Sequence, residues 1–224
     1  SWCNIMNNKI QEKLKGKYGE DYVRALIFSM SAEGSYSYRE ADTGLQTYKG
    51  ISRKWNPKWV GWNTIDKALE KYPELKIPYK KPPASIHKLN FELNVNEELE
   101  YLVYDFYYEN YYTKCGAWNI GGKLAVVLFD MAVISGTRRA SKTLQKTLNI
   151  HFKTNLVVDS QVGSGTLKVL NEIIGSKGLD LIVEKLIYEY QDNLIEAGKL
   201  EGNAPNLAGW MNRISHLSNY LRKL

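Results

Sequence analysis

The chain of 224 residues is long enough for one large hydrophobic core or two smaller ones, and 44% apolar with 24% charged residues is typical of a folded globular protein. This composition excludes an intrinsically disordered chain, and no run of about 18 apolar residues predicts a membrane span. With only two cysteines, Cys3 and Cys115, a disulfide framework and a structural zinc site are excluded. The net charge of +6 favours polyanionic surroundings such as nucleic acid, anionic lipid or wall polymer, although basic domains without a special partner are as common.

The beginning of the chain has neither an apolar h-region nor a cleavage site, so we expect no export signal within it. From there on, apolar residues recur at spacings of three and four, which predicts helices at 7–15, 20–32, 96–113, 123–135, 138–148, 166–174, 179–197 and 207–222. Glycines that follow such runs are expected to end helices, and these are Gly34, Gly136, Gly175 and Gly198. Strand signals are few, and the pattern predicts a mainly α protein.

The segment 54–94 departs from this pattern because it holds five of the six prolines of the chain. Proline removes a backbone donor and interrupts helices. We therefore predict an irregular excursion with one short helix at 64–71. Long loops of this kind are often functional.

Glu33 follows directly after the helix expected at 20–32 and continues its apolar side. The residues that share this side by spacing are Val23, Leu26, Ile27, Met30 and Glu33. Burial would raise the pKa of the Glu33 carboxyl and keep it protonated, as a general acid requires. A glutamate followed by Gly34 is, however, most often an ordinary helix terminus.

A second carboxyl group, Asp42, follows nine residues after Glu33. The intervening Ser-Tyr-Ser-Tyr segment is compatible with one arm of a hairpin, and Thr43–Gly44 with its turn. Glycosidic bond hydrolysis needs two carboxyl groups in different surroundings: one protonates the leaving oxygen, and the other assists water or stabilises the positive sugar carbon.

Aromatic residues are abundant, with 16 Tyr and 6 Trp. Trp55, Trp59 and Trp62 are spaced by four and three, which fits a sugar-stacking surface and fits equally a hydrophobic cluster that holds a long loop. Four tyrosines share one helical face and are expected in the core, namely Tyr101, Tyr104, Tyr108 and Tyr111. Tyr107 and Tyr112 are the ones expected to reach a cleft.

Other motifs are weaker. The sequence GSGT at 163–166 lacks the Lys-Ser or Lys-Thr ending of a phosphate loop, and the three histidines form no H-E-x-x-H motif. The basic cluster TRRASK at 137–142 is interpreted as a solvated helix start, and it is the best evidence for a nucleic-acid-binding alternative.

The run EGSYSYREADTGLQTYKGI, read together with this carboxyl pair, resembles the signature of glycoside hydrolase family 108, a family of bacterial and phage muramidases once labelled secretion activator proteins. The matching positions are Glu33, Gly34, Tyr36, Asp42, Gly44, Thr47, Gly50 and Ile51. Three positions depart from the pattern: Ser35 and Leu45 replace glycines, and Thr43 replaces a proline. These departures put the backbone of the hairpin in doubt more than the chemistry.

The C-terminal segments AVVLFDMAVISG, LQKTLN, VDSQVGSGT and GWMNRI resemble the module of the same proteins that is labelled a predicted peptidoglycan-binding domain. The resemblance implies a catalytic region at 1–113 and a helical peptidoglycan-binding-like region at 114–224. We expect both to pack as one body, because no linker separates them. Trp210 and Arg213 share one side of the last helix, where we expect Arg213 to pair with an acid and both residues to hold the halves together.

The resemblance implies a lysozyme-like helical fold with a small β-hairpin beside the active site, and an N-acetylmuramidase that cleaves the β-1,4 bond between N-acetylmuramic acid and N-acetylglucosamine. It implies Glu33 as general acid, Asp42 as its partner and Thr47 as support, and no cofactor or metal. Tyr36, Trp55 and Trp59 are expected to bind the substrate.

The expected partner is peptidoglycan, with no nucleic acid and a monomeric chain. The expected location is periplasmic or extracellular at the cell wall. Alternatively, the protein is encoded by a phage and released at lysis. The alternative is a non-catalytic peptidoglycan-binding or secretion-associated protein that retains the fold.

Overall fold

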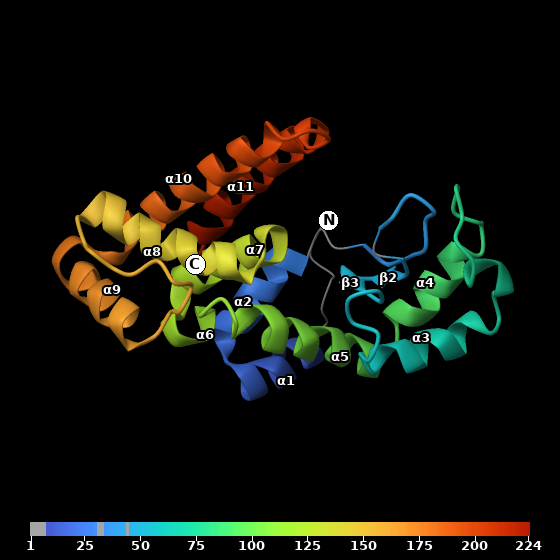
Figure 1. Cartoon of the computed structure of the whole chain (residues 1–224). Coiled ribbons are helices and arrows are strands. Elements are labelled where there is room, and N and C mark those ends of the chain that lie inside the picture. The colour runs from blue at the N-terminus through green and yellow to red at the C-terminus, as the bar shows by residue number, and fades with distance from the viewer. Residues whose placement is uncertain (1–7, 31–33, 44) are drawn as a thin grey trace. The chain divides into compact units, whose positions relative to one another are not determined.

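The structure is a computed structural model of the chain, and it describes residues 8–30, 34–43 and 45–224. These residues form eleven α-helices and a three-stranded antiparallel sheet (Figure 1). The helices are α1 (Asn8–Tyr18), α2 (Glu20–Ser29), α3 (Gly61–Leu69), α4 (Ile86–Asn94), α5 (Glu97–Tyr107), α6 (Ala117–Ile120), α7 (Gly122–Ser135), α8 (Thr137–Phe152), α9 (Ser164–Lys177), α10 (Leu179–Gly198) and α11 (Leu207–Leu221). The strands are β1 (Tyr36–Ser37), β2 (Thr47–Tyr48) and β3 (Ile51–Ser52). The predicted mainly α, lysozyme-like class with a small β element is confirmed.

The region 54–94 is more regular than predicted. The short helix α3 is present, but the irregular excursion ends in a second helix, α4, which the prediction missed. Its buried residues Ile86, Leu89 and Leu93 are spaced by three and four, so the helical signal was present behind the prolines. The helix end predicted at Gly175 was also wrong, because α9 continues through Gly175 to Lys177 and is followed by Gly178, which has a positive φ of 88°.

The chain folds into two compact units, each built from two stretches of sequence. The first unit comprises Ser1–Ile10 and Met30–Tyr107, and the second comprises Gln11–Ser29 and Tyr108–Leu224. The predicted regions, 1–113 and 114–224, differ from these units because α2 packs with the C-terminal helices.

In the first unit the sheet runs in the order β1-β2-β3. Tyr36 pairs with Tyr48, and Tyr48 pairs with Ile51, so these three buried side chains share the inner face of the sheet. Lys49 and Gly50 join β2 to β3 with φ angles of 44° and 79°. Two successive left-handed residues form the tight turn that matches strand twist, and glycine adopts this conformation without strain.

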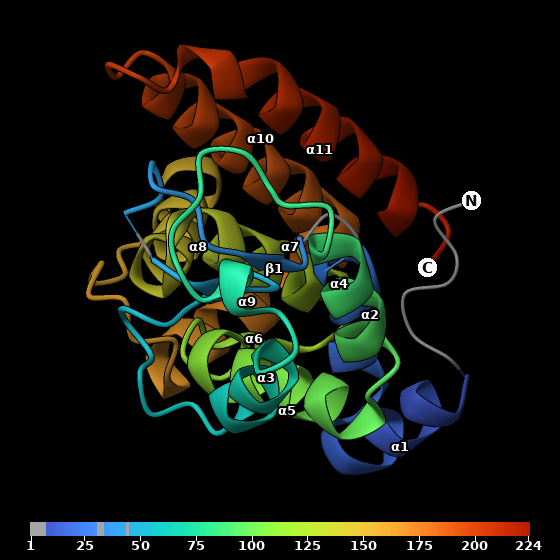
Figure 2. The ribbon, with the colours of Figure 1, turned by 90° about the vertical axis from the view of Figure 1, so that its right-hand side faces the viewer.

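Three helices accompany this sheet in the first unit. Helix α4 contacts β1, and α3, α4 and α5 contact one another (Figure 2). Their buried residues include Trp62, Ile65, Leu89 and Val103. The sheet is therefore backed by a small helical core.

The second unit is organised around α7. Nine consecutive residues of this helix, Leu124 to Ala132, are buried, as expected for a helix that is apolar on all sides. Helices α2, α6, α8 and α10 contact it, and α11 pairs with α10 (Figure 1).

Arg213 pairs with an acid, as predicted. Its Nη2 lies 2.6 Å from Oδ1 of the buried Asp130 and donates to the Ser29 carbonyl at 3.1 Å. The side chain therefore connects α11 to α7 and α2 within the second unit. Trp210, one turn earlier, is half-buried.

The prediction that Tyr107 and Tyr112 reach a cleft is wrong, because both are buried. The Tyr107 hydroxyl donates to the Lys49 carbonyl at 2.6 Å, and the Tyr112 ring packs 4.8 Å from that of Tyr22. A π-helical turn at Tyr108–Tyr112 follows α5 and shifts which side chains share a face, so α-helical spacing fails here.

Candidate active site

The outer face of the sheet carries small hydroxyl residues. Ser37 and Thr47 are register partners and so lie on the same face, opposite the buried tyrosines. Ser52 pairs with Thr47 on that face, and all three are half-buried. The alternation of the strands thus produces a row of hydroxyl groups at the surface of the first unit.

Asp42 is exposed and joins this row through Ser37, whose Oγ donates to Asp42 Oδ2 at 3.3 Å. Its loop is held by backbone hydrogen bonds from Asp42 N to the Arg39 carbonyl and from Leu45 N to the Asp42 carbonyl. Ser37 therefore links two of the predicted catalytic residues, Asp42 and Thr47. The sequence reasoning missed Ser37, although its place after the buried Tyr36 in a strand was a usable signal.

Glu33, the predicted general acid, lies outside the described residues, as does Gly44 of the predicted turn. In the chain Glu33 stands three residues before Tyr36, where β1 begins.

Leu45 occupies a position where the resembling pattern has glycine, and its φ is 58°. A left-handed backbone costs a leucine roughly 1–2 kcal/mol, whereas glycine adopts it freely. The loop after Asp42 thus keeps a glycine-type conformation at this position in spite of the substitution.

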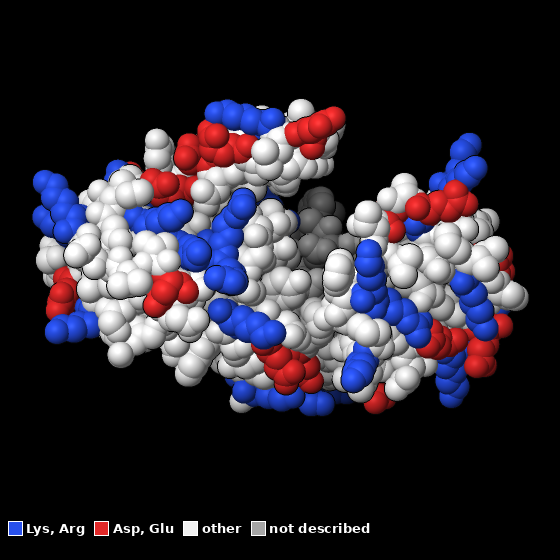
Figure 3. Space-filling model, viewed as in Figure 1, with Lys and Arg blue, Asp and Glu red and all other residues white. Residues whose placement is uncertain are grey.

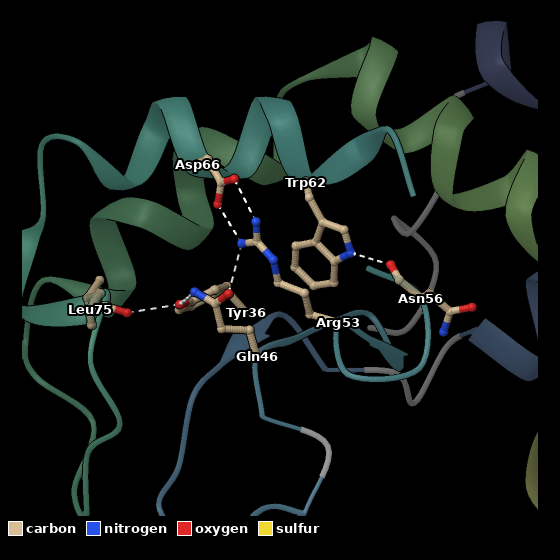
Figure 4. A network of polar contacts seen from close by, with 7 residues as sticks. All are labelled: Tyr36, Gln46, Arg53, Asn56, Trp62, Asp66 and Leu75. Atoms are coloured by element: carbon tan, nitrogen blue, oxygen red, sulfur yellow. Dashed lines mark hydrogen bonds and ion pairs between the residues drawn. The ribbon is translucent and has the colours of Figure 1, made fainter. Parts of the chain in front are cut away.

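Tyr36 lies on the side of the sheet that faces α3 (Figure 4). Its side chain is 3% exposed, its hydroxyl donates to the Leu75 carbonyl at 2.8 Å, and it accepts from Gln46 Nε2 at 3.0 Å. Burial raises the pKa of Tyr36 to about 12. Its ring and hydroxyl are thus engaged in the framework of the first unit, which does not favour the predicted contact with substrate.

Arg53 continues this network behind β3 (Figure 4). It forms a two-point ion pair with Asp66, at 2.6 and 2.8 Å, and donates to Gln46 Oε1 at 2.8 Å. Its guanidinium lies 5.1 Å from the Trp62 ring centre, and the hydrogen bond to Asp66 raises the Arg53 pKa. The network ties the sheet to α3.

The two predicted substrate tryptophans have different surroundings. Trp59 is half-buried: its ring packs on Trp62 and Phe106, and its Nε1 donates to the Leu102 carbonyl at 3.4 Å. Trp55 is 73% exposed, and Lys54 Nζ lies 5.0 Å from its ring centre. Trp59 matches the hydrophobic-cluster alternative, and Trp55 has a face open to a ligand.

The first unit also contains a glutamate with a shifted pKa, Glu100, which the sequence did not indicate. Burial raises the pKa of Glu100 and lowers that of Lys49, while the attraction between the two charges opposes both shifts. The Tyr104 hydroxyl donates to Glu100 Oε1 at 2.5 Å. Glu100 and Tyr104 belong to α5, and Glu100 is close enough to Tyr48 and Lys49 to shift their pKa values.

Within the described part of the chain, no three His, Cys, Asp or Glu side chains are grouped to hold a metal ion. None of the described helices combines the length and apolar character needed to cross a bilayer. Cys115 is a free, buried thiol, and burial raises its pKa to about 12.

Comparison with known proteins bears on this region. A solved structure, that of Brucella abortus SagA, superposes with a TM-score of 0.55 at 22% identity, covering 93% of this chain and 95% of that one. The two proteins thus share a fold over nearly their whole lengths. No curated protein matches the chain. The family model described as Glycosyl hydrolase 108 matches residues 26–136, which contain Glu33, Asp42 and Thr47, so this segment of the chain is similar to that family.

Proposed function

We propose that the protein is a peptidoglycan hydrolase that cleaves the β-1,4 bond between N-acetylmuramic acid and N-acetylglucosamine. The observation that carries the proposal is the glycosyl hydrolase 108 match at residues 26–136. It spans both carboxyl residues of the sequence signature.

In this proposal Glu33 protonates the leaving oxygen, and Asp42 activates water or balances the positive charge at the sugar carbon. The exposure of Asp42 supports its part, because water reaches the carboxylate while Ser37 Oγ orients it. Thr47, beside Ser37 on the hydroxyl row, supports the water or the sugar by hydrogen bonding.

Trp55 is the proposed stacking residue for a pyranose ring, because its face is exposed. Tyr36 and Trp59 act in this proposal as supports of the sheet and of the loop that carries Trp55. Action on peptidoglycan places the protein at the cell wall, either exported or released at lysis.

The experiment compares muropeptide release from purified peptidoglycan by wild type, Glu33→Gln and Asp42→Asn. Loss of general acid catalysis is expected to lower the rate roughly 10²- to 10⁴-fold in Glu33→Gln. Asp42→Asn should retain partial activity. Glu40→Gln, at an exposed position two residues before Asp42, is the matched control and should keep the wild-type rate. A folded Glu33→Gln protein with wild-type activity would refute the mechanism.

The stereochemistry of the product tests the arrangement further. We propose inversion of the sugar carbon, which requires the Glu33 and Asp42 carboxyl groups to be separated by roughly 6.5–9.5 Å so that a water molecule fits between Asp42 and the sugar. Proton NMR of the first sugar released reports the anomer directly.

The alternative, a wall-binding protein without activity, was suggested by the departures at Ser35 and Leu45. The left-handed backbone of Leu45 weighs against it, because the loop keeps its glycine-type conformation there. Binding of wild type to peptidoglycan without release of reducing ends would favour this alternative.

A further inference from the structure

The second unit contains a pocket of about 660 Å³ between α8 and α10. One wall presents four cationic residues of α8, Arg138, Arg139, Lys142 and Lys146. In Figure 3, Lys and Arg side chains gather over α8, next to acidic side chains of α10. The volume is in the range of small-ligand pockets.

These four cations carry a net positive charge that the pocket does not neutralise. Across the described residues, no ion pair is recorded for any of them. The opposite wall has two acids, Glu189, which lies 2.8 Å from His151 Nε2, and Glu196, which pairs with Lys199 Nζ at 2.6 Å, so the four cations exceed the acids of the lining. The pocket therefore offers cations that a bound anion can neutralise.

Helix stability does not explain these cations. Arg138 and Arg139 lie in the first turn of α8, where the helix dipole disfavours positive charge, and this turn has no acidic residue. Both arginines and Lys146 are exposed. A function in binding accounts for their position better than a function in folding.

The uncharged residues of the pocket lining indicate what the uncharged part of a ligand would contact. Asn193 Nδ2 donates to Thr143 Oγ1 at 2.9 Å, and Ala197 and Leu200 add aliphatic surface. Among the residues that the structure describes, no aromatic side chain lines the pocket, and these residues offer no surface of the kind on which proteins stack the bases of single-stranded nucleic acid. The lining fits a backbone of hydroxyl and methylene groups.

We infer that this pocket binds a linear chain of phosphodiesters on an aliphatic polyol backbone. Arginine pairs with phosphate through two parallel hydrogen bonds, which favours phosphate at Arg138 and Arg139. Arg138, Lys142 and Lys146 follow one another at intervals of four residues, about 6 Å along the helix axis, so they meet successive phosphates of an extended chain. This inference does not depend on the proposed hydrolase activity.

The test is calorimetric titration of the full chain with a synthetic glycerol phosphate hexamer at several salt concentrations. The double variant Arg139→Gln/Lys142→Gln should lower the affinity at low salt at least about tenfold, and should flatten the slope of log K against log salt by about 0.7 per lost contact. The matched control Lys168→Gln/Lys177→Gln removes the same charge from exposed positions of α9 and should leave both quantities unchanged. A thermal melt of each variant verifies that it is folded.

Three comparison ligands separate the sources of binding. Hexathymidylate has the same phosphodiester linkages with bases, hexaglutamate has carboxylates, and phosphatidylglycerol vesicles present glycerol phosphate on a membrane. The inference expects the glycerol phosphate hexamer to bind most tightly. Equal affinity of the pocket variant and the control variant, equal binding of hexathymidylate or hexaglutamate, or binding to vesicles alone would overturn it.

Discussion

Two arginine–carboxylate pairs, one in each unit, have the same closest N–O distance and very different surroundings. Arg213 and Asp130 in the second unit are separated by 2.6 Å, with side chains 13% and 0% exposed. Arg53 and Asp66 in the first unit are also separated by 2.6 Å, but their side chains are 31% and 47% exposed. Water screens the exposed pair Arg53–Asp66 but does not screen the buried pair Arg213–Asp130. The N–O distance alone therefore does not show which pair contributes more to stability.

The difference extends to the neighbours of each pair. Asp130 accepts hydrogen bonds from Ser29 Oγ at 2.8 Å and Tyr190 Oη at 3.0 Å in addition to Arg213. A buried carboxylate needs this complete set, because the loss of one partner leaves charge without compensation in a medium of low dielectric constant. Asp66, near the surface, can replace a lost partner with water.

The largest expected effect comes from removing α2 altogether. A fragment of residues 114–224 lacks Ser29 and exposes the side of α7 that α2 covers. We expect it not to fold cooperatively, as measured by circular dichroism during thermal melting. A fragment that melts in one sharp transition near the full-length temperature would show that α2 is dispensable.

Asp130→Ala leaves the Arg213 charge buried and should lower the free energy of unfolding by about 3–5 kcal/mol. Urea denaturation measures the loss. The double variant Asp130→Ala/Arg213→Met removes both charges and should be more stable than the single variant. Equal stability of the two variants would mean that the unpaired charge is not the cause.

Tyr190→Phe removes only the hydroxyl that donates to Asp130. A hydrogen bond to a charged group contributes roughly 1.5–3 kcal/mol, so the unfolding free energy should fall by that amount. Tyr188→Phe, at an exposed tyrosine of the same helix, is the control and should have no effect on urea denaturation.

Asp66→Asn tests the exposed pair. Because both side chains reach solvent and Arg53 keeps its hydrogen bond to Gln46, the loss should be about 1 kcal/mol or less and should shrink as salt is added. Urea denaturation at low and high salt measures it. A loss equal to that of Asp130→Ala would contradict the distinction between the two pairs.

Glu100→Gln should give the smallest change, a slight stabilisation at neutral pH. Burial raises the folded-state pKa of Glu100, so its contribution to stability is complete below the unfolded-state pKa and declines as pH rises through the folded-state value. Glutamine avoids this decline and can still accept from Tyr104. Thermal melts should therefore show a higher midpoint than wild type at pH 7 and none of this advantage at pH 3. The reverse order would contradict the pKa direction.

Local sequence predicted the long helices well, because their apolar faces repeat within the helix itself. It failed at α4, where prolines at 78, 82 and 83 obscured the spacing of Ile86, Leu89 and Leu93. It also failed at Tyr107 and Tyr112, beside and within the π-helical turn at Tyr108–Tyr112, because a change of helical period is not visible in the composition.

For contacts between residues far apart in the sequence, the type of partner could be predicted but not which residue it is. The sequence indicated that Arg213 meets an acid, but nothing in it distinguishes Asp130 from other acids or brings Ser29 and Tyr190 to the same carboxylate. Spacing likewise treated Trp55 and Trp59 as equals, whereas Phe106, on another helix, covers only Trp59. At the candidate site, the alternation of β1 predicts the outward Ser37, and its bond to Asp42 depends on the loop between them.

The pairing of α2 with α7 also determines when α2 can be buried during synthesis of the chain. Ser29 and Asp130 are 101 residues apart, so α2 leaves the ribosome well before its partner helix exists. At about 5–20 residues per second the delay is roughly 5–20 s. During this interval Tyr22, Val23 and Leu26, which α2 later buries, are available to chaperones. Conditions that slow translation between these helices should therefore lower the yield of folded protein.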